Sequence, residues 1–280
     1  MDAEGTTPRK AGKRRITDEV LIQVTGLRKA FGGRPVLAGV DLSVRRGEVL
    51  VIMGGSGCGK STLLRHLIGA IEPDEGRVEL FGKDLAALDE DGMNALRKRF
   101  GILFQSGALF NSLTVGENVA LPLREHSDLD EEIIRIVMKM KLELVGLRDF
   151  EGLMPGQISG GMKKRVGLAR ALALDPEILF YDEPGAGLDP VMAGVIDQLI
   201  LDLSGKLGVT SVVVTHEMGS AFRIADRRVM LYEGRVVAEG TPEEIRSSPD
   251  PLVRQFIRGE PDGPIPLRRS RIEYEVDLLS

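Results

Sequence analysis

The sequence predicts an α/β domain with a mainly parallel core sheet, and three observations lead to that fold class. Two apolar runs, Val49–Met53 and Glu177–Tyr181, have the composition of strands buried on both faces, as in a parallel sheet. A third run, Ser211–Val214, has the same character. Stretches with helical periodicity, Glu131–Val145 and Gly161–Ala173, lie between these runs, and such alternation favours a parallel sheet.

The sequence also predicts a further helix, a hairpin turn and five further strands. A helix is expected over Lys60–Ala70, directly after a glycine-rich segment. Gly234 is expected to form the turn of a hairpin. Further strands are expected at Leu21–Val24, Gly76–Leu80, Phe100–Phe104, Val229–Tyr232 and Arg235–Glu239.

Composition limits the classes of function. The 280 residues suffice for one large domain or two small ones, and 42% of them are hydrophobic. The net charge of −5 gives no support to a nucleic-acid partner, because nucleic-acid binders are more often basic. The single cysteine, Cys58, cannot form an internal disulfide, which fits a reducing compartment. No apolar run reaches the roughly 18–20 residues of a membrane helix. The basic N-terminus has no apolar stretch behind it and does not resemble a secretory signal, so a cytoplasmic address is expected.

The glycine-rich segment matches the pattern G-x-x-x-x-G-K-[ST] between a predicted buried strand and a predicted helix. Its glycines let successive backbone N–H groups point at a phosphate, and the following helix adds the positive end of its dipole. Lys60 is expected to reach the outer phosphates, and the Ser61 hydroxyl to ligate Mg²⁺. The pattern predicts a P-loop NTPase with nucleotide-binding residues Gly54, Gly55, Ser56, Gly57, Cys58, Gly59, Lys60, Ser61 and Thr62.

The second apolar run ends in two acids. Asp182 is expected to lie beside the phosphate loop and to hold Mg²⁺. Glu183 follows directly, and a carboxylate there is suited to polarise the attacking water as general base. Buried strands often end in acids, so this pattern gains its weight only from being paired with the phosphate loop.

A further segment narrows the class of NTPase. Ile158-Ser159-Gly160-Gly161-Met162 resembles the L-S-G-G-Q signature of ABC ATPases, with departures at Ile158 and Met162. The hydroxyl of Ser159 and the backbone N–H groups of Gly160 and Gly161 would suit a phosphate at a helix start. The alternative, a simple helix N-cap, uses the same groups.

Four more residues stand in the order that the ABC family requires, and the resemblance covers roughly residues 20 to 258. It implies that Gln105 contacts Mg²⁺ and senses a partner, and that Asp189 crosses to another subunit. It also implies that His216 contacts the γ-phosphate, and that Phe31 stacks on adenine. With Lys60 and Glu183, His216 completes the expected catalytic set.

The resemblance also implies an architecture: a P-loop NTPase with a mainly parallel core sheet, an N-terminal antiparallel β subdomain and an inserted helical subdomain. The ATPase domain is expected over residues 19–258, with the helical subdomain at about 106–175. Residues 1–18 are expected to be a disordered basic tail and 259–280 a C-terminal extension. The signature of one chain would complete the ATP site of a second copy, which implies a head-to-tail homodimer.

Within the family, three places resemble the ATPase subunits of Mla phospholipid-transport systems, the Mla and Mkl group. They are residues 104–126, the S-G-G-M form of the signature, and residues 249–266. This resemblance implies a transmembrane permease and an MCE-domain lipid-binding protein as partners, and a place at the cytoplasmic face of the inner membrane. It also implies that the C-terminal extension reaches the other ATPase copy, although a solvated tail remains the alternative.

Two other functions remain open. One is the ATPase subunit of an importer for a polar solute such as an amino acid, since such subunits look similar through residues 20–240. The other is a soluble ABC ATPase acting on DNA or ribosomes. Proteins of that second kind commonly carry tandem ATPase domains, long coiled coils or zinc-binding cysteines, none of which the sequence predicts here.

Overall fold

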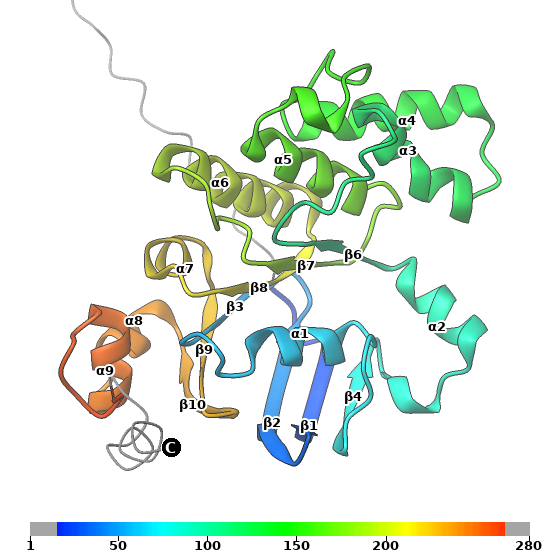
Figure 1. Cartoon of the computed structure of the whole chain (residues 1–280). Coiled ribbons are helices and arrows are strands. Elements are labelled where there is room, and N and C mark those ends of the chain that lie inside the picture. Colours follow the sequence, from blue (N-terminus) through cyan, green and yellow to red (C-terminus); the bar gives the residue numbers. More distant parts are fainter. Residues whose placement is uncertain (1–15, 267–280) are drawn as a thin grey trace, which may run out of the picture.

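The computed structural model describes residues 16–266, whose strands form two sheets (Figure 1). The larger sheet has six strands in the order β10-β9-β3-β8-β7-β6, and only the β9–β10 pair is antiparallel. The prediction of a mainly parallel core sheet is therefore confirmed. Its strands are β3 (Val49–Met53), β6 (Phe100–Leu103), β7 (Ile178–Asp182), β8 (Thr210–Thr215), β9 (Arg227–Tyr232) and β10 (Arg235–Gly240).

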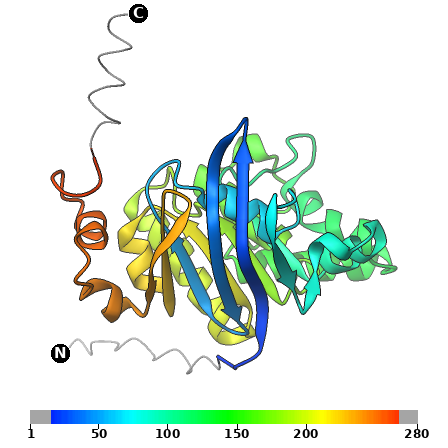
Figure 2. The same ribbon diagram turned by 90° about the horizontal axis from the view of Figure 1, so that it is seen from below.

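The smaller sheet is the predicted N-terminal antiparallel β subdomain, and Figure 2 shows its two long strands crossing in front of the larger sheet. Its strand order is β2-β1-β4-β5. The first strand is much longer than the expected Leu21–Val24, because bulges, one of them around Gly26 with φ +58°, bend it without ending it. The strands are β1 (Val20–Phe31), β2 (Arg34–Arg45), β4 (Glu75–Leu80) and β5 (Lys83–Asp84).

Helices cover both faces of the six-stranded sheet. In Figure 1, α3 to α6 lie above this sheet, and α1 lies below it with the antiparallel strands. The helices are α1 (Lys60–Leu67), α2 (Glu90–Arg97), α3 (Val115–His126), α4 (Glu131–Leu144), α5 (Gly160–Ala171), α6 (Pro190–Leu207), α7 (Met218–Ile224), α8 (Pro242–Arg246) and α9 (Pro251–Arg258). Two short 3₁₀ helices are η1 (Leu85–Ala87) and η2 (Pro155–Gln157).

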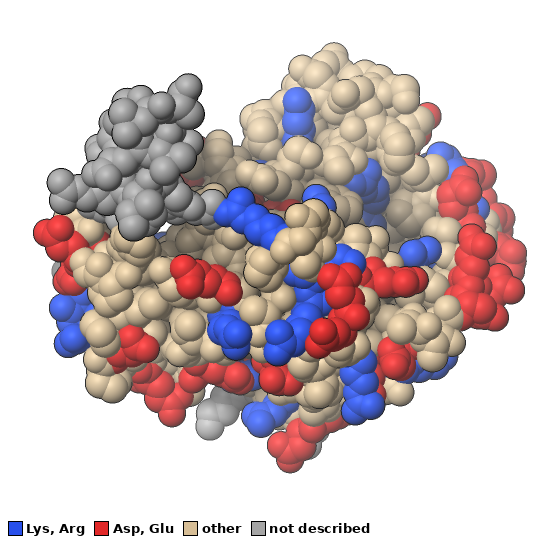
Figure 3. Space-filling view, turned by 60° about the horizontal axis from the view of Figure 1, so that its bottom comes forward, with Lys and Arg blue, Asp and Glu red and all other residues tan. Residues whose placement is uncertain are grey.

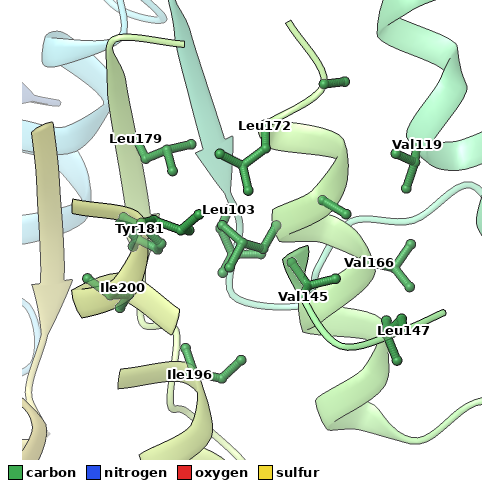
Figure 4. Packing of buried hydrophobic residues seen from close by; sticks show 14 of the residues in the cluster. Leu103, Val119, Val145, Leu147, Val166, Leu172, Leu179, Tyr181, Ile196 and Ile200 are labelled. Carbon is green, nitrogen blue, oxygen red and sulfur yellow. The ribbon is translucent and has the colours of Figure 1, made fainter. Parts of the chain in front are cut away.

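The central strand β3 divides its side chains between two cores. Val49 and Val51 belong to the cluster shared with α3, α5 and α6, whereas Leu50 and Ile52 belong to the cluster shared with α1 and the antiparallel sheet. Successive side chains of a strand point to opposite faces, so a sheet covered on both sides needs apolar residues at every position. Figure 4 shows the helical side, where β7 contributes Tyr181.

Helix ends agree with local capping chemistry. Asp189 accepts hydrogen bonds from the first turn of α6, which begins with Pro190, and Thr114 opens α3 with a capping box. The helix α1 ends at Leu67 and not at the expected Ala70, because Gly69 adopts φ +65°.

The predicted tail 1–18 and extension 259–280 fall outside the described residues, except for 16–18 and 259–266. Within the described range, none of the helices has the length and apolar character to span a bilayer.

Candidate functional site

The carboxyl ends of four neighbouring parallel strands bring the predicted residues to one edge of the large sheet. The phosphate loop follows β3, His216 follows β8, Glu183 follows β7, and Gln105 lies two residues beyond β6. Strands that run parallel end at the same edge, where open α/β sheets bind their ligands. The tertiary structure thus assembles residues that are far apart in the sequence.

The phosphate loop needs glycine at particular positions. A Cβ at Gly54 would lie 2.3 Å from the carbonyl oxygen of Leu231, and one at Gly59 would lie 2.9 Å from that of Val36. Gly59 has φ +108°, which side-chain-bearing residues rarely adopt. A Cβ at Gly55 would meet nothing within 4 Å, so this part of the loop is open. The loop therefore packs tightly against the rest of the chain at Gly54 and Gly59, and it is open at Gly55.

Lys60 is buried and bridges the loop that precedes it. Its Nζ donates to the carbonyl oxygens of Gly54 at 2.7 Å and Gly55 at 2.9 Å. The ammonium therefore lies over the loop where phosphate oxygens are expected. Ser61 is exposed and Thr62 half-buried in the first turn of α1.

Cys58 is buried inside the loop, and a Cβ on Gly54 would come within 2.6 Å of its Sγ. Burial raises the pKa of the Cys58 thiol, against the opposing effect of the Lys60 charge. The thiol is therefore packed as a small apolar group and is not poised as a nucleophile.

Asp182 ends β7 next to the phosphate loop. Burial raises the pKa of the Asp182 carboxyl, and the neighbouring charge of Glu183 adds to this, whereas Arg65 and Lys60 lower it. A carboxylate held in this partly desolvated position gains from a cation, and oxygen donors are the ligands that Mg²⁺ prefers. The hydroxyl of Ser61 and the amide oxygen of Gln105 are donors of the same kind, so the predicted set fits Mg²⁺.

Glu183 is held in a strained backbone conformation with φ +48°. Its N–H donates to the carbonyl oxygen of Val214 in β8 at 2.9 Å. Its carboxylate receives the backbone N–H of His216 at 3.3 Å and lies 2.8 Å from His216 Nδ1. A carboxylate that is ionised only accepts, so the His216 tautomer with its proton on Nδ1 is the one that suits this contact.

The signature residues lie elsewhere. Ser159 caps α5, accepting from the N–H of Met162 at 3.3 Å. A Cβ at Gly160 would meet nothing within 4 Å, so nothing in residues 16–266 of this chain requires glycine there. The helix α5 packs on the face of the sheet opposite to α1, which carries Lys60. The structure therefore does not bring the signature and the phosphate loop of one chain together.

Two other predicted residues make few contacts with the rest of this site. Phe31 ends β1 with 49% of its surface exposed, and the Lys29 ammonium lies 5.7 Å from its ring centre. Asp189 directs its carboxylate to the first turn of its own helix, with Oδ1 accepting from Val191 and Met192.

Three polar residues that support the site were not predicted. Lys164 on α5 is buried, and its ammonium donates to the loop after Glu183. Asn118 is buried and bonds the loop before α3. Asp197 on α6 accepts from Ser220 on α7. Each of the three shares a helical face with buried residues of its own helix, which is a signal for burial but not for the contacts that the side chain makes.

The fold and the site define an ABC-type ATPase, and comparisons with known proteins agree. The profile of the family described as ABC transporter matches residues 37–186. The chain belongs to this family of ATP-binding cassettes.

Several curated relatives share more than the family. The chain is 45% identical over 248 residues to the intermembrane phospholipid transport ATP-binding protein MlaF of Escherichia coli, covering 89% of this chain and 92% of the relative. It is 43% identical to the protein of that name from Haemophilus influenzae, with 92% and 98% covered. It is also 43% identical to the probable ribonucleotide transport ATP-binding protein mkl of Mycobacterium tuberculosis, with 91% and 71% covered.

Solved structures agree with the fold. The dimeric post-hydrolysis state of the ATP-binding cassette MJ0796, bound to ADP and Pi, superposes with a TM-score of 0.73 at 34% identity, covering 79% of this chain and 98% of that chain. CbiO1 from Clostridium perfringens, part of an ABC transporter complex, gives a TM-score of 0.77 at 30% identity, covering 93% and 100%. The prediction that this chain is an ATP-binding ABC ATPase is therefore confirmed.

Proposed function

We propose that this ATPase drives phospholipid transport between two membranes, as a homodimer bound to a permease at the cytoplasmic face of the inner membrane. The observation that carries the proposal is 45% identity over nearly the full length of a phospholipid-transport ATP-binding protein. The relative of the same name in Haemophilus influenzae is covered over 98% of its length. The likeness covers 89% of this chain and therefore extends beyond the short motifs of the ATP site.

In the proposed ATP complex, the phosphates lie on the loop 54–59, and Lys60 moves its ammonium from the loop carbonyls to phosphate oxygens. Phe31 stacks on the adenine. Ser61, Gln105 and Asp182 hold Mg²⁺, which neutralises charge on the phosphates when it is bound. Magnesium bound through few protein ligands takes its other ligands from phosphate and water.

Glu183 is the proposed general base for the attacking water. The contacts of its carboxylate with His216 orient it, and its neighbour Asp182 is the proposed metal ligand. His216 is the proposed contact of the γ-phosphate. Through its contact with Glu183, it would couple the position of the base to whether the γ-phosphate is bound.

A second copy of the chain is proposed to complete each site. Ser159, Gly160 and Gly161 lie on a helix that packs on the other side of the sheet from the phosphate loop. The open space around Gly160 suits an approach from outside the chain. The dimeric cassette structures with which this chain superposes are consistent with this arrangement.

A hollow of about 670 Å³ is the proposed docking place of the permease. Its lining includes the exposed rings of Phe104 and Phe110, together with Leu121 and Pro122 of α3. An exposed apolar hollow is typical of a protein-binding surface. It adjoins Gln105, so a segment docked here would lie next to a proposed metal ligand. An MCE-domain lipid-binding protein is the further partner proposed for the complex.

A polar solute is the second candidate substrate. The mycobacterial relatives carry a name that refers to ribonucleotide transport, and they are as similar in sequence as the Haemophilus protein. This chain, however, spans only 71% of the Mycobacterium tuberculosis relative. A role on nucleic acid gains no support from the face in Figure 3, where basic and acidic side chains are interspersed.

The test is affinity purification of the tagged full chain from membranes solubilised in mild detergent, with mass spectrometry of the proteins and lipids that co-purify. A permease together with an MCE-domain protein and phospholipid would support the proposal. A permease with a solute-binding protein and no lipid would favour the second candidate. Soluble or nucleic-acid partners alone would contradict a transport function.

A further inference from the structure

The helix α5 carries a buried lysine that the proposed catalysis does not use. Lys164 has only 5% of its surface exposed. Its Nζ lies 3.3 Å from the carbonyl oxygen of Glu183, 2.8 Å from that of Pro184 and 2.6 Å from that of Ala186. An ammonium has three N–H donors, so the three carbonyls use all of them.

These three carbonyls belong to the loop that starts at the proposed general base. Glu183 has φ +48°, and a non-glycine residue stays in such a conformation only where its surroundings impose it. On one side, its N–H is held by Val214 of β8. On the other side, Lys164 holds the carbonyl of Glu183 and the next turn of the chain. The two contacts together determine where the Glu183 side chain leaves the backbone.

Two neighbouring glutamates favour the charged form of the Lys164 side chain. Burial lowers the pKa of the Lys164 ammonium, whereas Glu217 and Glu183 raise it. Glu217 follows His216, and a Cβ at Gly185 would come within 2.6 Å of its Oε2. The acids around the loop thus favour the charged form, which is the form that can donate to three carbonyls at once.

The helix that carries Lys164 also holds the loop that follows Gln105. Arg170 donates to the carbonyl oxygens of Ala108 at 2.9 Å and Gly107 at 3.1 Å. The N-terminus of the same helix carries the signature residue Ser159. One helix is therefore bonded both to the loop with the proposed base and to the loop that follows a proposed metal ligand.

We propose that Lys164 is a positioning residue for ATP hydrolysis, which acts through Glu183 by holding the backbone of residues 183–186. This inference rests on the proposed role of Glu183 as general base. Because Lys164 does not contact the phosphate loop, its loss should lower the rate of the chemical step and leave ATP binding intact.

The experiment compares Lys164→Met and Lys164→Gln with Lys163→Met in the full chain, assembled with its co-purifying membrane components. Lys163 precedes Lys164 on α5 but is not among the donors to this loop. We expect Lys164→Met to lower kcat by about 30-fold and to change KM for ATP by less than about 3-fold. Lys164→Gln keeps two N–H donors and should lose about 5-fold, whereas Lys163→Met should match the parent.

A second measurement tests whether Lys164 acts through Glu183. In single-turnover assays, Lys164→Gln in the Glu183→Gln background should cause no further loss of rate, because the group that it positions is already absent. This cycle uses the milder variant, so it decides the question even where Lys164→Met fails to fold.

Three results would overturn the inference: unchanged kcat in Lys164→Gln, a rise in KM at unchanged kcat, or a further loss of rate in the Glu183→Gln background. Evidence against Glu183 as the general base would be a separate result. Full hydrolysis by Glu183→Gln alone would contradict the role of Glu183, whatever the Lys164 variants do.

Discussion

The Nδ1 atom of His216 lies 2.8 Å from Oε1 of Glu183, and the backbone N–H of His216 donates to the second carboxylate oxygen at 3.3 Å. Both oxygens of the carboxylate are thereby oriented by the residue that follows β8, although the glutamate itself follows β7. The proposed base, Glu183, and the proposed γ-phosphate contact, His216, are therefore in direct contact. Substitution of either residue should change the rate of ATP hydrolysis.

The substitution Glu183→Gln keeps the shape of the side chain and removes the proton acceptor. We expect ATP turnover to fall by about 10²–10⁴-fold, the usual contribution of general acid–base catalysis, with ATP affinity nearly unchanged. ATP binding without hydrolysis should accumulate a stable dimer. Phosphate release and size-exclusion chromatography with ATP and Mg²⁺ measure the two effects, and full hydrolysis would contradict the assignment.

The substitution His216→Ala removes the side-chain contact to Glu183 but keeps the backbone N–H that donates to it. We expect kcat to fall by about 10²-fold, as when one preorganised donor is removed from an active site, with a smaller change in KM. The control is Lys83→Ala, at an exposed position of β5. A variant that loses ATP affinity and keeps kcat would show that His216 serves binding alone.

The substitution Gly54→Ala places a Cβ 2.3 Å from the carbonyl oxygen of Leu231. Because that neighbour is backbone, the loop or β9 must shift, and we expect the free energy of unfolding to fall by about 1–3 kcal/mol. The stabilisation by ATP should also disappear. The control Gly205→Ala on α6 meets no neighbour and should raise the free energy of unfolding by about 0.5–1 kcal/mol. Urea unfolding with and without ATP measures both, and a stable Gly54→Ala variant that binds ATP would contradict the clash.

Cys58 is the only cysteine, so thiol labelling reports on the phosphate loop alone. Its burial and the raised pKa of its thiol leave little reactive thiolate at neutral pH. We expect slow alkylation that accelerates as the pH rises and is slowed further by ATP, and we expect the alkylated chain to lose ATP binding. Intact-mass spectrometry follows the adduct, and Cys58→Ser is the unlabelled control. Retention of ATP binding after complete alkylation would contradict the predicted role of the loop.

Asp182 gives a prediction about pH. Its pKa is raised in the folded chain, chiefly by burial, so the fold binds this proton more tightly than the unfolded chain does. Ionisation therefore costs stability; the cost is absent below the unfolded value of about 3.9 and complete above the raised folded value. We expect Asp182→Asn to abolish hydrolysis and to raise the melting temperature at pH 7.

The gain in melting temperature from Asp182→Asn should shrink as the pH is lowered from 7 toward 4.5. The exposed residue Asp128 provides the control, since Asp128→Asn should show no such pH-dependent gain. A variant less stable than the parent at pH 7 would show that the carboxylate stabilises the fold.

Local patterns in the sequence determined the elements that carry the chemistry. The strand β3 was predicted at its observed bounds, Val49–Met53, because five consecutive apolar residues before a glycine-rich turn fit a strand buried on both faces. The helix α4 begins at the predicted residue, where Asp130 caps it and two acids form its first turn. It ends one residue before its predicted end. Strand β1 was predicted too short, because a bulge at glycine extends a strand where local propensity suggests a turn.

The sequence by itself determined that this chain binds a nucleotide phosphate and belongs to the ABC ATPases, because the groups concerned follow one another in single segments. Only the tertiary structure decided which groups act together. The parallel order of β3, β8, β7 and β6 brings Lys60, His216, Glu183 and Gln105 to one edge. The three carbonyls of residues 183–186 that Lys164 contacts could likewise not be predicted from the sequence. The physical reason is that such contacts join helices and strands far apart in the chain, and local periodicity carries no information about which of them meet.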